Sequence, residues 1–177
     1  MRIIKQTEYR VMPWKNGGGT TTEIHASPVG ASAFDWRVSI ASVDSDGPFS
    51  VFNGYQRHIM LLTGSGMTLD VAAHGRFELK VLMPFSFSGD AEVYGCLAQG
   101  RVVDFNLMVR REFGSGTLRF QQSTAACEIG ADDSKHLVHM LGGDSVLLDL
   151  GERFTFPANI GLAICKIIAQ SQPSQVV

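Results

Sequence analysis

The chain has 177 residues, 45% of them hydrophobic, which is enough apolar material for one packed domain or two small ones in direct contact. Its formal net charge of −2 is spread along the sequence without a basic run, and this argues against nucleic acid and anionic membrane as partners. Three isolated cysteines without a C-x-x-C spacing argue against structural zinc and indicate a reducing, cytoplasmic location.

The N-terminal segment Met1–Glu8 lacks an apolar stretch, so we expect no signal peptide. A short helix is predicted at Ile4–Tyr9, and the rest of the chain alternates in the manner of strands separated by Gly, Asp and Asn. In chain order the predicted strands are Thr20–Ala26, Trp36–Val43, Arg57–Thr63, Met67–Val71, Phe77–Leu82, Glu92–Leu97, Val102–Arg110, Gly116–Gln121, His136–Gly142, Asp144–Leu148, Arg153–Phe156 and Gly161–Ile168.

Many short strands and almost no helix predict an all-β sandwich, jelly roll or barrel. The number of predicted strands exceeds what a single small roll requires, so we expect a second sheet layer or a second, reduced roll. We therefore predict a single compact unit over residues 1–177, with halves at 1–111 and 112–177. The joint between them falls at Arg111–Phe113 or at Asp132–Lys135.

Two segments, 57–69 and 136–148, share one pattern: a polar start, an apolar strand, a glycine-containing turn and a second strand. This pattern predicts hairpins with turns at Gly64–Gly66 and Gly142–Asp144. It also raises the hypothesis of an internal repeat.

The segment Pro13-Trp14-Lys15-Asn16-Gly17-Gly18-Gly19 places a cation, an amide and an indole beside three glycines. It is not a phosphate loop, because G-x-x-x-x-G-K-[ST] is missing and a strand, not a helix, follows. Two interpretations stay open. The glycines form a tight bend at a sheet edge, or the bend also presents Lys15 and Asn16 to a pocket.

Several short motifs in a fixed order make the chain similar to the HutD/Ves family of the cupin superfamily. They are the segment 13–19, Asp35-Trp36-Arg37-Val38-Ser39, Gly47-Pro48-Phe49-Ser50, Gly54-Tyr55-Gln56-Arg57, Pro84-Phe85-Ser86-Phe87-Ser88-Gly89-Asp90 and Asp104-Phe105-Asn106-Leu107-Met108-Val109-Arg110-Arg111. The resemblance implies a compact double, bicupin-like jelly-roll β-barrel. It also implies a link to bacterial histidine utilisation, in which a small pathway metabolite is bound and flux or expression is moderated.

Metal-binding cupins carry H-x-H-x(3,4)-E, with a turn glycine about seven residues after the glutamate. Counting back from Gly64 places Arg57 where the glutamate ligand would stand, and no H-x-H precedes it. A guanidinium cannot ligate a metal. His136 and His139 are three apart on a predicted strand and therefore face opposite sides. The sequence thus predicts no metal and no cofactor.

An inward-facing arginine is suited to bind a carboxylate through two parallel hydrogen bonds. Arg57 is therefore either a carboxylate clamp for a ligand or half of a structural ion pair with Asp44, Asp46 or Asp104. Buried without any partner it would be costly.

Alternation on the strand 102–110 gives one wholly apolar face, Val103, Phe105, Leu107 and Val109, and one polar face, Asp104, Asn106, Met108 and Arg110. The apolar face is predicted core, and the polar face is a pocket wall or a solvated surface. On the strand 36–43, Trp36 belongs to an apolar set. Arg37 lies on the opposite face, toward pocket or solvent.

We expect Arg57, Asn106, Asn16, Lys15, Asp104 and Arg37 to form a ligand-binding site, with no catalytic residue assigned. The expected ligand is a small carboxylate, with urocanate or a formylated glutamate as candidates from the resemblance. The alternative is an isomerase or hydrolase of a small organic acid, with His58 or Asp104 as general base. An interaction module that binds another protein, and pairing into a homodimer, also stay open.

Overall fold

The structure is a computed structural model that describes residues 1–31 and 33–170. Within those residues it consists of strands and one 3₁₀ turn, η1 (Gln6–Glu8), and no helix there is long and apolar enough to cross a bilayer. The strands are β1 Arg2–Ile4, β2 Arg10–Pro13, β3 Gly19–Ser27, β4 Trp36–Val43, β5 Gly47–Pro48, β6 Tyr55–Thr63, β7 Met67–Val71, β8 Gly75–Leu79, β9 Phe85–Ser88, β10 Val93–Leu97, β11 Val102–Arg110, β12 Gly114–Ser123, β13 Cys127–Gly130, β14 Lys135–Met140, β15 Ser145–Leu148, β16 Arg153–Phe156 and β17 Ile160–Ala169.

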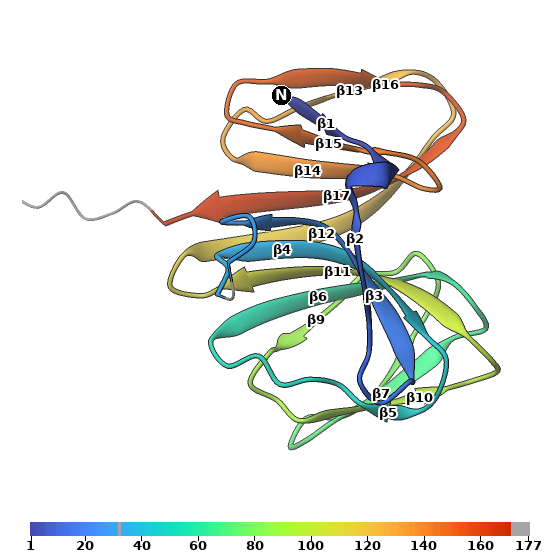
Figure 1. Ribbon diagram of the computed structural model, residues 1–177. Helices are drawn as coiled ribbons and strands as arrows, with labels where there is room; N and C mark the ends of the chain where they lie inside the picture. The colour runs from blue at the N-terminus through green and yellow to red at the C-terminus, as the bar shows by residue number, and fades with distance from the viewer. Residues whose placement is uncertain (32, 171–177) are drawn as a thin grey trace, which may run out of the picture.

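These strands form four sheets. The six-stranded sheet has the order β2-β3-β4-β11-β6-β9, and the four-stranded sheet has the order β5-β10-β7-β8. The five-stranded sheet has the order β1-β15-β14-β17-β12, and β13 pairs with β16 in a two-stranded ribbon. In Figure 1 the six- and four-stranded sheets lie in the lower part of the view, and the five-stranded sheet and the ribbon lie in the upper part.

Three apolar clusters lie between successive layers. Ile59 of the six-stranded sheet and Leu69 of the four-stranded sheet belong to one cluster. Trp36 and Phe105, on the other face of the six-stranded sheet, share a second cluster with Leu137 of the five-stranded sheet. A third cluster fills the space between the five-stranded sheet and the ribbon. The fold is therefore a cupin-like jelly roll built from facing sheets. The closed β-barrel expected from the sequence is wrong, because these sheets do not join into one barrel, and the double arrangement stays a prediction.

The all-β prediction is confirmed, and each predicted strand corresponds to an observed one. The bounds of four predicted strands, 36–43, 67–71, 102–110 and 153–156, are those of β4, β7, β11 and β16. The sequence pattern did not predict β1, β2, β5, β9 and β13, which have at most four residues each. Such strands are too short to show alternation, and their pairing partners define them.

The helix predicted at Ile4–Tyr9 is wrong in extent, because Ile4 ends a strand and the helical turn is limited to Gln6–Glu8. Strand β1 pairs antiparallel with β15, with Ile3 opposite Val146. Figure 1 shows this first strand among the C-terminal strands. The N-terminus therefore completes the sheet of the chain's second half. The boundary near residue 111 stays a prediction.

One of the two predicted hairpins is wrong. Strands β14 and β15 pair across the turn at Gly142, as predicted, with His139 opposite Ser145. Strands β6 and β7 do not pair with each other, because β6 lies in the six-stranded sheet and β7 in the four-stranded sheet. Gly64 forms the corner between these sheets with φ of 113°. The two segments therefore differ in structure, and the repeat hypothesis for them is not supported.

Candidate functional site

The inner face of the six-stranded sheet forms the floor of a cavity of about 470 Å³. Met108 of β11 lies opposite Arg37 of β4 on one side and Arg57 of β6 on the other, so these three residues form a row across the sheet. Asn106 and then Asp104 follow on β11, because alternate residues of a strand share a face. Asp104, Asn106 and Met108 of the polar face predicted for this strand therefore line a pocket, whereas Arg110 does not line it and pairs with Asp35.

Two loops form the rim of the cavity. The turn between β2 and β3 contributes Trp14, Lys15 and Asn16, and the chain from β4 to β6 contributes residues 45–50 and Phe52. The side chains of Lys15 and Asn16 are exposed there. All the residues predicted for the site line this one cavity: Lys15, Asn16, Arg37, Arg57, Asp104 and Asn106.

The glycine-rich turn at the rim is held by its own backbone contacts. The Oδ1 atom of Asn16 accepts a hydrogen bond from the backbone N–H of Gly18 at 3.1 Å, and the N–H of Trp14 donates to the carbonyl of Gly19 at 3.0 Å. A Cβ atom on Gly19 would lie 2.2 Å from the carbonyl oxygen of Ser42. Gly19 is therefore required for close approach to β4. The turn is both a tight bend and part of the cavity wall.

Arg57 is the most deeply placed cation of the cavity, with an exposed fraction of 6%. Its Nη1 donates to the carbonyl of Ser50 at 3.2 Å and its Nη2 to Oδ1 of Asn106 at 3.4 Å, while its Nε has no partner among the described residues. The guanidinium carbon lies 4.9 Å from the ring centre of Phe87. Burial lowers the pKa of Arg57 to about 10, an effect that the charge of Asp104 opposes.

Arg37 is the second cation of the cavity floor. Its Nη2 donates to the sulfur of Met108 at 3.4 Å, and its Nε has no partner among the described residues. The guanidinium carbons of Arg37 and Arg57 lie 5.3 and 5.5 Å from the ring centre of Phe52. Burial lowers the pKa of Arg37 as well. Two guanidiniums thus share one aromatic ring, and each keeps hydrogen-bonding capacity unused.

Asp104 is the one carboxylate on the cavity floor within the described residues, and its exposed fraction is 1%. Its Oδ1 accepts a hydrogen bond from Nδ2 of Asn106, whereas its Oδ2 has no partner among the described residues. Burial raises the pKa of Asp104 to about 7, although the charge of Arg57 and the hydrogen bond from Asn106 both act to lower it. Asn106 therefore links the cation to the acid.

A structural ion pair for Arg57 is not found within residues 1–31 and 33–170, where it takes part in no contact of that kind. Asp44 pairs instead with Arg101 at 2.5 Å, and Asp46 accepts the backbone N–H of Leu97 at 2.8 Å. Of the three acids considered from the sequence, Asp104 alone acts on Arg57, through Asn106 and through its charge.

The donor set of the cavity does not fit the metal site of a cupin. The floor offers two guanidiniums, an amide, a thioether and one carboxylate. In the described part of the chain, no three His, Cys, Asp or Glu side chains are grouped closely enough to hold a metal ion. His58 faces away from Arg57 and its Nδ1 is 2.7 Å from Oγ of Ser86. His139 stacks on Phe105 at 5.6 Å in the core between the sheets.

The aromatic part of the site was not predicted from the sequence. Phe49 and Phe52 come from the loop before β6, and Phe87 comes from β9, so that all three rings lie within 5.5 Å of the guanidinium carbon of Arg57. The motif Gly47-Pro48-Phe49-Ser50 was a usable signal for Phe49. Phe52 and Phe87 carried no signal of their own, because only the fold brings their strand and loop against Arg57.

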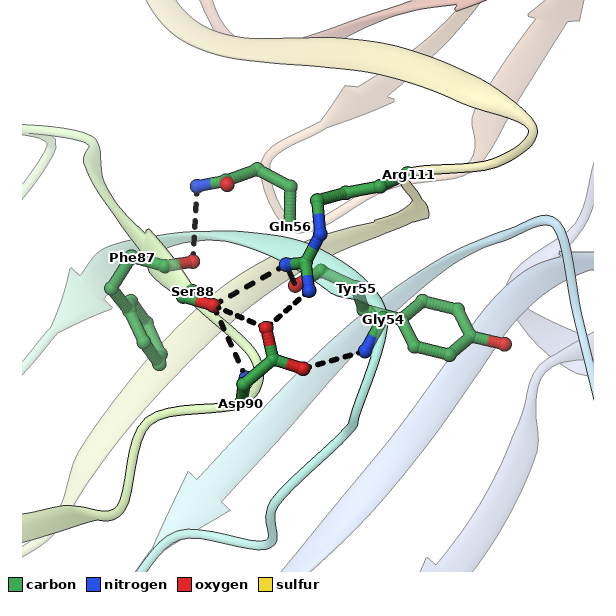
Figure 2. A network of polar contacts seen from close by, with 7 residues as sticks. All are labelled: Gly54, Tyr55, Gln56, Phe87, Ser88, Asp90 and Arg111. Carbon is green, nitrogen blue, oxygen red and sulfur yellow. Dashed lines mark hydrogen bonds and ion pairs between the residues drawn. The ribbon is translucent and has the colours of Figure 1, made fainter.

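A polar network beside the cavity fixes the loop that carries Phe52 (Figure 2). Nη1 of Arg111 donates to the carbonyl of Tyr55 at 2.9 Å, and its Nη2 pairs with Asp90. Asp90 in turn accepts hydrogen bonds from the backbone N–H of Gly54 at 2.7 Å and from the hydroxyl of Ser88 at 2.8 Å. These bonds lower the pKa of Asp90 to about 2, with the Gly54 N–H contributing most. The end of β11 is therefore tied to β6 and β9.

The family model described as HutD matches residues 6–167. An uncharacterized 21.2 kDa protein in the hutC 3'region of Pseudomonas putida is 37% identical over 158 residues, which is 85% of this chain and 83% of that protein. Protein Ves of Citrobacter koseri is 38% identical over 121 residues, or 66% of this chain and 63% of the length of Ves.

Solved structures of similar proteins have the same fold as this chain. A conserved protein of unknown function from Pseudomonas aeruginosa PAO1 has a TM-score of 0.80 at 30% identity, over 96% of this chain and 99% of that one. HutD from Pseudomonas fluorescens SBW25, solved in a formate condition, has a TM-score of 0.72 at 30% identity with the same coverage. Ylba from E. coli, at 8% identity and a TM-score of 0.65 over 88% of this chain and 85% of that one, shares the fold alone. The chain belongs to the HutD family.

Proposed function

We propose that this protein binds a small carboxylate metabolite in the cavity on the inner face of the six-stranded sheet and thereby moderates histidine utilisation. Urocanate and a formylated glutamate are the candidate ligands. The observation that carries the proposal is the pair Arg37, which is half-buried, and Arg57, which is buried: both face one cavity and form no ion pair among the described residues.

The physical argument is one of missing charge compensation. A buried guanidinium without an anionic partner is unfavourable in the empty protein, and a bound carboxylate removes that penalty. The planar fork of an arginine donates hydrogen bonds to both oxygens of a carboxylate at once. The rings of Phe49, Phe52 and Phe87 lower the local dielectric constant around Arg57, which strengthens such a bond.

The regulatory part of the proposal rests on the family. Relatives carry the names HutD and hutC-region protein, and these link the family to histidine utilisation. A protein that binds a pathway acid without consuming it can report the concentration of that acid. The free cysteines Cys96, Cys127 and Cys165 support a cytoplasmic location. A homodimer is part of the proposal and is tested by light scattering.

The test of ligand binding is calorimetric titration of the purified protein with urocanate and with N-formylglutamate. Replacement of Arg57 by Met keeps the apolar stem and removes the fork, so we expect affinity to fall roughly tenfold to a hundredfold. Arg76→Met is the matched control, because Arg76 lies in an exposed ion pair with Asp70 away from the cavity. Equal affinity of wild type and the Arg57 variant would refute the role of Arg57 as a carboxylate clamp.

The regulatory role is tested in cells that grow on histidine. Replacement of the chromosomal gene by the Arg57→Met form is expected to alter transcript levels of the histidine-utilisation genes as much as deletion does. A variant that does not bind ligand but leaves those levels unchanged separates binding from regulation and refutes the second half of the proposal.

A second candidate function, an isomerase or hydrolase of a small acid, is favoured by one observation. Asp104 faces the cavity, has an unpartnered Oδ2 and a pKa raised to about 7, which suits a general base. His58, the other candidate base, lies on the opposite face of β6 and does not line the cavity. Incubation of the protein with each candidate acid, followed by NMR, distinguishes turnover from binding.

A further inference from the structure

We infer that Asp104 is a specificity-determining residue that selects carboxylates carrying a neutral N–H donor. The inference rests on the proposed function and names the second recognition group of the same cavity. Arg57 and Arg37 would hold the carboxylate of the ligand, and Oδ2 of Asp104 would accept the N–H.

The first support is the geometry of the carboxylate. Asp104 is fixed by its position on the central strand β11 and by Asn106, whose Nδ2 donates a hydrogen bond to Oδ1 of Asp104. The Asp104 side chain lines the cavity, and its Oδ2 is shielded from solvent and has no hydrogen-bond partner among the described residues. An ionised carboxylate can only accept hydrogen bonds. A group that satisfies Oδ2 must therefore be a donor.

The second support is the charge balance of the cavity. Its lining within the described residues holds three cationic side chains, Lys15, Arg37 and Arg57, and two acidic ones, Asp46 and Asp104. The net charge is +1 when all are ionised. A monocarboxylate with a neutral N–H, such as urocanate, brings this to zero, whereas an amino acid that carries one carboxylate and one ammonium leaves it at +1. A dicarboxylate such as N-formylglutamate brings it to −1. For a monocarboxylate, the balance therefore favours an amide, pyrrole or imidazole N–H over an ammonium group.

The third support is the spacing of the two recognition groups. Arg57 lies in the row of Met108, two rows along β11 from Asp104, and reaches back to Asn106 in the row between them. Adjacent rows on one face are about 7 Å apart. The guanidinium and Oδ2 are thus separated by roughly one row, which suits a carboxylate and an N–H at the two ends of a short chain or ring.

The experiment compares ligand pairs that differ in one atom. 3-(Pyrrol-2-yl)acrylate presents an N–H where 3-(furan-2-yl)acrylate presents an oxygen, and N-formylglutamate differs in the same way from the formate ester of 2-hydroxyglutarate. Titrations at pH 8 keep Asp104 ionised, above its pKa of about 7. We expect wild type to bind the N–H member of a pair at least tenfold more tightly, because the oxygen member leaves a charged acceptor unpaired.

Asp104→Asn provides the matched variant. Since Oδ1 must still accept from Asn106, the new amide NH₂ takes the place of Oδ2 and turns an acceptor into a donor. The preference is then expected to vanish or to reverse toward the oxygen member. A purely structural role for Asp104 would change both affinities together and leave their ratio unaltered.

The outcomes are distinct. If both members of each pair bind equally and Arg57→Met weakens both, the proposed function stands and the inference is overturned. If neither pair binds wild type, both are overturned. A wild-type preference for the N–H member that survives in Asp104→Asn assigns the selectivity to another residue and also refutes the inference.

Discussion

Replacement of Arg57 by Met should stabilise the empty protein while it removes carboxylate binding. The side chain is 6% exposed and forms no ion pair among the described residues, so its charge is held in the apolar interior at a cost. Methionine fills nearly the same length without a charge, and the surrounding rings of Phe49, Phe52 and Phe87 can pack against it.

The magnitude follows from the shifted pKa. Burial lowers the pKa of Arg57 from 12.5 to about 10, which corresponds to about 3 kcal/mol of destabilisation of the charged form. The hydrogen bonds to Ser50 and Asn106 are long, at 3.2 and 3.4 Å, and their loss costs about 1 kcal/mol each. The variant should therefore be more stable by about 1 kcal/mol. Below the pKa of Asp104, loss of the attraction between the two charges adds little.

The assay is urea denaturation at pH 6, where Asp104, with its pKa of about 7, is mainly protonated. We expect the free energy of unfolding of Arg57→Met to exceed that of wild type by about 1 kcal/mol, with Tm higher by about 2–4 °C. The control Arg76→Met should stay within about 0.5 kcal/mol of wild type. If the free energy of unfolding of the Arg57 variant were lower than that of wild type by more than about 2 kcal/mol, the guanidinium would be stabilising the fold and the reasoning would be refuted.

Three further predictions concern stability. Because the folded-state pKa of Asp104 is raised to about 7, the stability of wild type relative to Asp104→Asn should fall as the pH rises from about 4 to 7, by at most roughly 1.4 kcal/mol per pH unit. Denaturation at several pH values measures this, and a stability difference that does not change with pH would contradict it. The pKa of Asp90 is lowered to about 2, so the advantage of wild type over Asp90→Asn should be full above pH 4 and disappear as the pH falls toward 2, as followed by circular dichroism; an advantage that persists at pH 2 argues against the network as its source. Gly19→Ala should lower the free energy of unfolding by about 1–3 kcal/mol, since the added Cβ would lie 2.2 Å from the carbonyl oxygen of Ser42, whereas Gly47→Ala, with open space, should be close to neutral; equal effects would refute the close approach.

Much of the cavity floor was predictable because strand alternation is a local property. The period of two on β11 separated Asp104 and Asn106 from the core residues Phe105 and Leu107, which are fully buried. The same rule on β4 placed Arg37 on the face opposite Trp36. These statements need only the sequence, since successive side chains of any strand point to opposite sides.

The pairing of strands was not predictable in the same way. The corner at Gly64 and the pairing of β1 with β15 join segments by contacts distant in sequence, and short strands carry no periodic signal of their partners. A glycine-containing turn has the same sequence pattern whether the chain folds back into a hairpin or passes into another sheet. The hairpin predicted at residues 64–66 was wrong for that reason.

The sequence by itself determined the all-β class, the family and which face of each long strand is polar, because these depend on residue type and spacing along one segment. Only the tertiary structure decided that Arg57 lacks an ion-pair partner within the described residues, that Phe52 lies beside two guanidiniums, and that Oδ2 of Asp104 is left unpaired. The physical reason is that charge compensation and desolvation are set by neighbours in space, and the fold alone assigns those neighbours.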